Sequence, residues 1–287
     1  TVVPILGAGS SMADYKIGFK WWALIIAVVF VISELVCVAC VPERPVACDE
    51  KPGKISDMFK ALFKNDQAMT VVVSIILVYT SLNICGNLVL YFFRFDVGNE
   101  GAYSIFAAVA FAAQVLVMMV IPLLRKRFSK SQLFISGFII QIAGFAVILI
   151  MAFAKLYTPQ SWYILCLPGI LIYLGYGMLN VIMTIFLSDS VDYGEVMNGT
   201  RDESVIFSMQ TFTVKLASGV AVFLAGLVVD WIHLDTAAAV QTQDTLDALR
   251  MWMTIPSVIL LIVGIFVFKR FYKLDDTRME EIKSKLN

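Results

Sequence analysis

One charged residue, Lys215, lies near the middle of a long apolar stretch, residues 204–231. A charge at the centre of a membrane span costs at least about 2.5–3.5 kcal/mol on insertion scales, so it has to face a cavity or a partner group. Ser208, Thr211 and Ser218 flank it at steps of three and four residues, which places the four side chains on one helix face. Such a stripe suits a hydroxylated or anionic ligand, although an ion pair or a hydrogen-bonded seam between helices uses the same residue types.

Two more polar stripes occur in other apolar stretches. The first has four-residue steps and consists of Tyr79, Asn83, Asn87 and Tyr91. The second has steps of three and four residues and consists of Tyr173, Tyr176, Asn180 and Thr184. An Asn amide offers donors and an acceptor that can satisfy a sugar diol, and Tyr adds a flat apolar face with a hydroxyl. Interhelical hydrogen bonding is the alternative for each stripe, but three stripes together favour a wet central cavity.

A dense run of charge follows the second stripe, at residues 188–203. We interpret this run as a loop in which Asp189, Asp192 and Glu195, three residues apart, share one face of a short helical turn. Three carboxylates could hold a divalent ion, but their spacing matches no ligand template. An ion-pair latch with Arg201 and with basic loops explains the charges more economically, so we predict no metal site.

The segments that position these residues are long and apolar. The 287-residue chain is 60% apolar and 15% charged, whereas a soluble domain is about 45–50% apolar. Seven runs are long enough to cross a hydrocarbon core of about 30 Å. They are residues 19–41, 69–93, 102–124, 132–154, 162–187, 204–231 and 251–268. Because backbone groups in lipid must pair internally, these runs predict an all-α polytopic membrane protein.

Basic residues gather in alternate connections between these runs, at 44–64, 125–130, 201 and 269–285. Since basic connections stay in the cytoplasm, we expect a multi-pass protein of the cell (plasma or inner) membrane with a cytoplasmic C-terminus. Within the first connection, the apolar residues of 55–64 recur at steps of three and four, which predicts an amphipathic helix on the membrane face. The net charge of zero gives no indication of a nucleic-acid partner.

The motif D-x-x-D-Y-G-E at residues 189–195, followed by G-x-R at 199–201 and a span containing Lys215, resembles the glycoside–pentoside–hexuronide cation symporters. That family includes the melibiose and glucuronide permeases and belongs to the major facilitator superfamily. The short basic turn at 125–130 is also similar to the family's loop between helices 8 and 9. The resemblance covers essentially the whole chain, from the end of helix 5 through helix 12.

This resemblance implies the C-terminal six-helix bundle of a twelve-helix, two-bundle fold, together with helix 6 of the N-terminal bundle. Residues 1–41 are then expected to hold the end of helix 5 and helix 6, and 42–67 a cytoplasmic linker between the bundles. Residues 68–273 are expected to form the six-helix bundle, and 274–287 a cytoplasmic tail. On this interpretation the chain is a fragment whose start has been cut away.

The resemblance further implies a secondary active sugar transporter that works by alternating access and is driven by H⁺ or Na⁺. Glycosides, pentosides and hexuronides are the expected substrates, and the family's helix 11 lysine, which contributes to the central site, matches Lys215. The family binds the coupling cation mainly through acidic residues of helices 2 and 4, which this chain does not include.

These arguments together define two sets of candidate residues. The sugar-binding set is Lys215, Thr211, Asn83, Asn87, Tyr79, Asn180 and Tyr176, and the latch set is Asp189, Asp192, Glu195 and Arg201. The sequence has no nucleophile–base pair and no ATP-binding loop, so we expect neither an enzyme nor a cofactor. The expected partners are a small sugar, the lipid bilayer and the other half of the carrier. The alternative is a non-transporting membrane remnant or sensor derived from a truncated transporter.

Overall fold

The computed structural model describes residues 12–40, 63–199, 203–238 and 240–286. The chain divides into two units, Thr1–Gly53 and Lys54–Asn287, and the boundary falls within the linker predicted at 42–67. The described part of the first unit is a single helix, α2 (Met12–Cys40).

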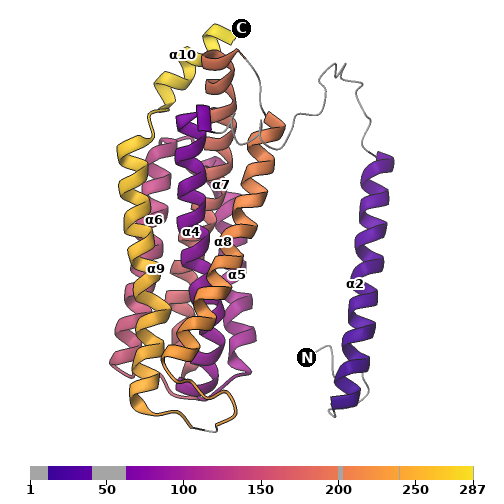
Figure 1. Ribbon diagram of the computed structural model, residues 1–287, viewed down its shortest axis with the longest axis vertical. Helices are drawn as coiled ribbons and strands as arrows, with labels where there is room; N and C mark the ends of the chain where they lie inside the picture. The colour runs from indigo at the N-terminus through magenta and orange to yellow at the C-terminus, as the bar shows by residue number, and fades with distance from the viewer. Residues whose placement is uncertain (1–11, 41–62, 200–202, 239, 287) are drawn as a thin grey trace. The chain divides into compact units, whose positions relative to one another are not determined.

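The described part of the second unit contains six long helices followed by a short one (Figure 1). The long helices are α4 (Asp66–Tyr91), α5 (Ala102–Leu124), α6 (Lys130–Phe153), α7 (Cys166–Asn198), α8 (Glu203–Trp231) and α9 (Gln243–Phe271), and the short one is α10 (Asp276–Leu286). A π-helical turn (Phe92–Asp96) extends α4, and a 3₁₀ turn (Trp162–Leu165) precedes α7. In the described ranges, seven helices are long and apolar enough to cross a membrane. The predicted all-α membrane fold is therefore confirmed.

Local sequence explains where three of these helices begin. The Asn65 side chain accepts a hydrogen bond from the Ala68 amide at the start of α4. At the start of α9, the Thr242 hydroxyl accepts one from the Thr245 amide. At the start of α6, Ser129 and Gln132 exchange hydrogen bonds between side chain and backbone. Each of these bonds satisfies an amide that has no partner within the helix, which stabilises the helix end by about 1 kcal/mol.

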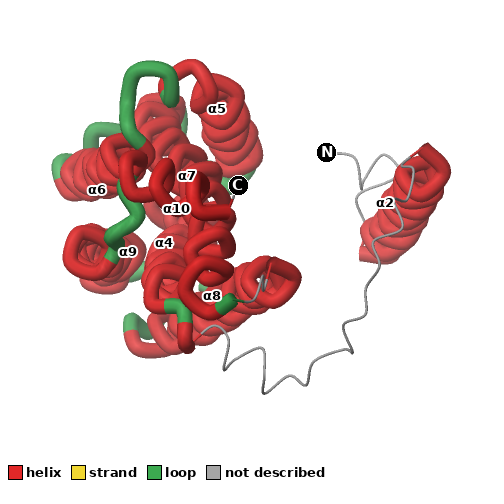
Figure 2. Tube along the Cα trace, turned by 90° about the horizontal axis from the view of Figure 1, so that it is seen from above, coloured by secondary structure: helices red, strands yellow, loops and turns green. Residues whose placement is uncertain are grey.

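The helices α4 and α7 form the centre of the six-helix unit. They are the most buried of its spans, whereas α5 and α8 are the least buried. α4 packs against α8, α9 and α7, and α7 packs against α6 and α5. In the view along the helices, α6 and α9 lie on one side of the unit and α5 and α8 on the other (Figure 2). The two central helices are the ones that carry the Tyr–Asn stripes.

Glycines bring α6 and α7 into close contact. A Cβ atom added at Gly175 would lie 2.6 Å from the backbone nitrogen of Gln141 and 2.6 Å from the carbonyl oxygen of Gly137. Small residues allow this approach, and dispersion contacts between closely packed backbones are a main source of helix association in lipid. This contact fixes the position of α7 and thereby of the polar residues that it carries.

The structure corrects the prediction that residues 188–203 form a loop. α7 continues through this charged run to Asn198 and ends at Gly199, which adopts the left-handed conformation (φ 72°). Asp189 and Ser190 are buried within it, and the Ser190 hydroxyl donates to the carbonyl of Phe186. The apolar run stops where the helix leaves the hydrocarbon, and the helix continues because its charged residues find partners there.

One other boundary differs from the sequence prediction, because α9 begins at Gln243 rather than 251. The predicted tail, residues 274–287, includes the helix α10. Met279 and Ile282 of α10, together with Leu274 just before it, pack against side chains near the end of α7. The amphipathic helix predicted at 55–64 lies outside the described residues except for its last two positions.

Candidate functional site

Side chains from two of the predicted stripes meet at the centre of the unit. The Asn180 amide of α7 donates a hydrogen bond to the Tyr79 hydroxyl of α4. The rings of Tyr79 and Tyr176 pack edge to face with their centroids 5.5 Å apart. The rings of Tyr173 and Tyr176 also pack edge to face, with their centroids 6.4 Å apart. The tertiary structure thus joins residues about 100 positions apart in the chain into one group, which we call the Tyr–Asn cluster (Tyr79, Tyr173, Tyr176 and Asn180).

Asn83 and Asn87 continue the stripe along α4 from this cluster. Each amide nitrogen donates to a carbonyl one turn earlier, Asn83 to Tyr79 and Asn87 to Asn83, both at 2.7 Å. Both residues are half-buried, and their amide oxygens receive no hydrogen bond from the described residues. A helix face that presents amide oxygens and a phenol next to an aromatic ring can accept hydroxyl protons and cover an apolar surface.

Lys215 and Thr211 are not part of this cluster. Both are exposed on α8, and the residues that α8 buries, such as Met209, Thr213 and Ala217, lie on the opposite side of the helix. The Thr211 hydroxyl bonds to the carbonyl of Phe207 on its own helix. The structure therefore places the Lys215 stripe on the outward face of α8, whereas the Tyr–Asn cluster lies between α4 and α7.

A network of charges lies at the end of the unit where α7 and α9 finish. Lys130, at the start of α6, forms an ion pair with Asp189, and both side chains are buried. Lys130 also lies 3.5 Å from Asp276 of α10, which in turn pairs with Arg125 at 3.2 Å. Burial raises the pKa of Asp276, but the hydrogen bond and charge of Arg125 and the charge of Lys130 outweigh it and hold that pKa below its usual value.

Of the predicted latch residues, Asp189 is thus paired with the basic turn at 125–130. Asp192 and Glu195 are half-buried on α7, and Arg201 lies outside the described residues. The three carboxylates do not converge on a metal-binding position within the described part of the chain. Besides adding to the charge asymmetry that predicts the membrane topology, the 125–130 turn ties three helices together through the buried Lys130.

The opposite end of the unit contains a buried ion pair that sequence reasoning missed. Both nitrogens of one edge of the Arg250 guanidinium bond to the Asp96 carboxylate, with Nε at 2.8 Å, and both side chains are 3% exposed. Asp247 accepts from the same guanidinium at 2.7 Å, and the Tyr157 hydroxyl donates to Asp96 at 2.6 Å. Burial, together with the neighbouring Asp96 charge, raises the pKa of Tyr157.

One sequence signal could have identified this pair. Asp96 follows the end of one apolar run and Arg250 precedes the start of another. In the predicted topology, these two run ends lie on the same side of the membrane. The pair joins the end of α4 to the start of α9 and includes Tyr157 from the connection between α6 and α7.

Comparison with known proteins places the chain in a family of carriers. The family model described as MFS/sugar transport protein matches residues 1–276. The chain therefore belongs to this family, which confirms the resemblance to sugar symporters of the major facilitator superfamily. Its relatives are transport proteins rather than enzymes, as the sequence predicts.

Several curated relatives are named as symporters, carriers or transporters. An uncharacterised symporter of Bacillus subtilis is 24% identical over 274 residues, which is 95% of this chain and 58% of the relative. A raffinose carrier protein of Pediococcus pentosaceus is 24% identical over 81% of this chain and 35% of the relative. An isoprimeverose transporter of Lactiplantibacillus pentosus is 25% identical over 96% of this chain and 55% of the relative. The chain thus spans about half the length, or less, of these relatives.

Proposed function

We propose that this chain supplies one half of a secondary active sugar transporter that is coupled to H⁺ or Na⁺ and works by alternating access. The Tyr–Asn cluster between α4 and α7 is the observation that best supports sugar binding. Two relatives carry raffinose and isoprimeverose in their names, and both sugars are rich in hydroxyls. The coupling cation would bind outside this chain.

The cluster suits the chemistry of a sugar ring. A pyranose has apolar C–H faces that stack on aromatic rings, and Tyr79 and Tyr176 offer such rings. Its hydroxyls need acceptors, and the amide oxygens of Asn83 and Asn87 provide them from the same side of α4. Asn180 holds the Tyr79 hydroxyl in place, so a bound sugar would meet a preorganised surface.

The outward face of α8 supports the presence of a second half. Lys215 is exposed near the middle of an apolar span, where a charge needs a polar partner. Gly219 and Gly226 follow on the same face, and a Cβ atom at either position would meet nothing within 4 Å. Small residues beside a polar group are typical of a helix interface in lipid. We therefore assign this face to contact with the N-terminal half, where Lys215 would reach the central site from the border between the halves.

The charged networks at the two ends suit a carrier with two states. At one end, Asp189, Asp276, Lys130 and Arg125 link α7, α10 and the turn before α6. In our proposal Arg201 pairs with Asp189, Asp192 or Glu195 in one transport state and separates from that partner in the other. A coupling of about 1 kcal/mol is enough to shift a nearly balanced two-state equilibrium several-fold.

The decisive experiment is uptake of labelled glycosides by cells whose membranes carry the complete gene product, under imposed H⁺ and Na⁺ gradients. Asn180→Ala should weaken sugar binding by several-fold or more, because Tyr79 loses its hydrogen-bond donor. The matched control is Tyr163→Phe, which removes a hydroxyl from an exposed tyrosine of the same region. Uptake and binding at the wild-type level in Asn180→Ala would exclude the cluster as the sugar site.

The second candidate function is a membrane remnant or sensor that does not transport. Binding of sugar without gradient-driven uptake by the complete gene product would support it.

For either function we place the C-terminus in the cytoplasm. In a cysteine-free background, Arg127→Cys and Lys283→Cys should react with impermeant thiol reagents only from the inside, and Asp244→Cys only from the outside.

A further inference from the structure

A groove of about 580 Å³ lies between the start of α4 and the end of α9. Its apolar lining includes the half-buried Met69, Val73 and Val267 and the exposed Phe63 and Phe271. Its mouth carries Asp66, Arg270 and Lys273. α8 runs obliquely across the unit (Figure 1). Its far end meets α9 through the rings of Trp231 and Trp252, 5.9 Å apart. At the groove, by contrast, α8 contributes no lining residue, so α8 leaves the surface between α4 and α9 uncovered.

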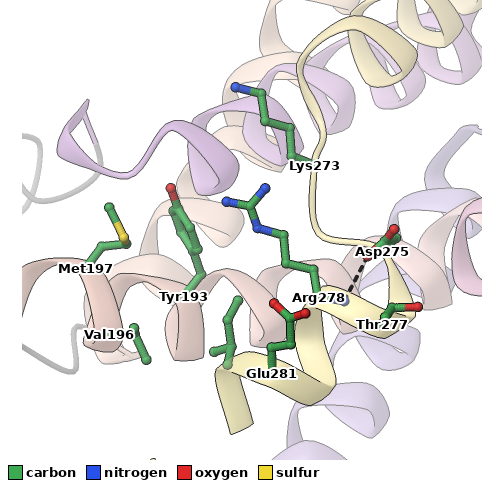
Figure 3. A pocket seen from close by; sticks show the side chains of 9 residues that line it. Tyr193, Val196, Met197, Lys273, Asp275, Thr277, Arg278 and Glu281 are labelled. Carbon is green, nitrogen blue, oxygen red and sulfur yellow. Dashed lines mark hydrogen bonds between the residues drawn. The ribbon is translucent and has the colours of Figure 1, made fainter. Parts of the chain in front are cut away.

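Within the part of the chain that the structure describes, the cations at the mouth of this groove have no ion-pair partner. The ion pairs of the described residues involve Arg94, Arg125, Lys130 and Arg250, and neither Arg270 nor Lys273 takes part in one. Figure 3 shows the Lys273 side chain pointing away from Glu281 and Arg278 of the neighbouring pocket. The one carboxylate of the groove, Asp66, accepts a hydrogen bond from Gln67 at 2.9 Å. The mouth therefore carries one net positive charge.

A buried side chain ties the two walls of the groove together. Gln67 is 1% exposed; its carbonyl oxygen accepts from the Lys273 amide at 2.8 Å, and its amide donates to the Phe271 carbonyl at 3.4 Å. These bonds satisfy backbone groups where α9 ends, and they fix the chain that carries Arg270 and Lys273 against the first turn of α4. The groove is thus a built feature rather than a gap between independent helices.

The position of the groove matches the polar–apolar boundary of a bilayer. It follows the first two turns of one membrane span and the last turn of another. Its cations therefore lie at the level of lipid headgroups, and its valines at the level of the first acyl carbons. Basic pockets between transmembrane helices at this level are typical binding sites for anionic lipid headgroups.

We propose that this groove binds an anionic phospholipid, with the phosphate between Arg270 and Lys273 and an acyl chain along Met69, Val73 and Val267. Phosphatidylglycerol carries the single net negative charge that neutralises the mouth. A zwitterionic lipid would leave that charge uncompensated and would have to place its amine against Asp66, which is already engaged by Gln67.

The test is native mass spectrometry of the purified protein after equilibration with equimolar phosphatidylglycerol, phosphatidylethanolamine and phosphatidylcholine of identical acyl chains. We expect phosphatidylglycerol to be retained over the other two, and Arg270→Gln and Lys273→Gln each to reduce its retention about fivefold. Lys269→Gln is the matched control, since this exposed lysine is adjacent in the chain but does not line the groove. Val73→Phe should also reduce retention, because it fills the apolar part and leaves every charge in place.

Several outcomes would overturn the proposal. Equal retention of the three lipids would mean contact without headgroup recognition, and a preference for phosphatidylethanolamine would move recognition to Asp66. An equal loss in Lys269→Gln and Arg270→Gln would mean attraction by the general surface charge. No bound lipid in any variant would mean that another part of the chain covers the groove. Size-exclusion profiles and melting curves of each variant confirm that it is folded.

Discussion

The buried pair of Asp96 and Arg250 should be one of the most sensitive points of the six-helix unit. Both side chains are 3% exposed, and two hydrogen bonds join them. Removing one partner of such a pair leaves a buried charge without compensation, which destabilises a protein by about 3–5 kcal/mol. Asp247 still contacts the guanidinium, so we expect Asp96→Asn to fall at the lower end of this range.

Arg250→Met should fall at the upper end, because among the described residues it leaves the Asp96 carboxylate with only the Tyr157 hydroxyl as partner. The double variant Asp96→Leu with Arg250→Met removes both charges together. Since well-packed apolar groups replace buried ion pairs at little net loss of stability, the double variant should recover most of the stability that the single variants lose.

The assay is unfolding of the purified protein by titration with sodium dodecyl sulfate, followed by far-ultraviolet circular dichroism. Arg94→Met is the matched control, because Arg94 pairs with Glu100 on the surface at 3.7 Å, and exposed pairs contribute about 0–1 kcal/mol. If Asp96→Asn unfolds within about 1 kcal/mol of the wild type, or if the double variant is as unstable as the worse single variant, the burial argument is wrong.

Three further predictions concern the packing, the pH response and the outward face of α8. Gly175→Ala should separate α6 from α7 and destabilise the protein by about 1–3 kcal/mol, whereas Gly86→Ala, with open space around it, should not; equal unfolding curves would refute this. The pKa of Asp276 is lowered in the folded state, so its pairing contributes stability above its usual pKa of 3.8 that is lost as the pH falls further. The penalty of Asp276→Asn should thus shrink below about pH 4, and a pH-independent penalty would contradict the pairing. Lys215→Ala should lower sugar affinity at least several-fold in the complete gene product, and Lys215→Arg should rescue it poorly; wild-type binding by both variants would show that this lysine is structural.

The sequence by itself determined the class of this protein and the helices on which its polar residues lie. Apolar runs of about 20 residues predict membrane spans whatever the helices pack against, because the bilayer imposes their length and their internal hydrogen bonding. Likewise, four-residue steps place Tyr79, Asn83 and Asn87 on one face of any helix. The membership in a family of sugar carriers followed from motifs that are local in the chain.

Only the tertiary structure decided which of these side chains meet. Tyr79 and Asn180 are 101 residues apart, and Arg250 and Asp96 are 154 apart, and no periodicity within one span specifies such a pair. For the same reason, the helical run through Asp189 could not be read from hydropathy: that residue is compatible with the fold because Lys130 of another helix neutralises it. Hydropathy records the preference of a residue for lipid or water, whereas the position of a buried charge depends on a partner that the fold alone supplies.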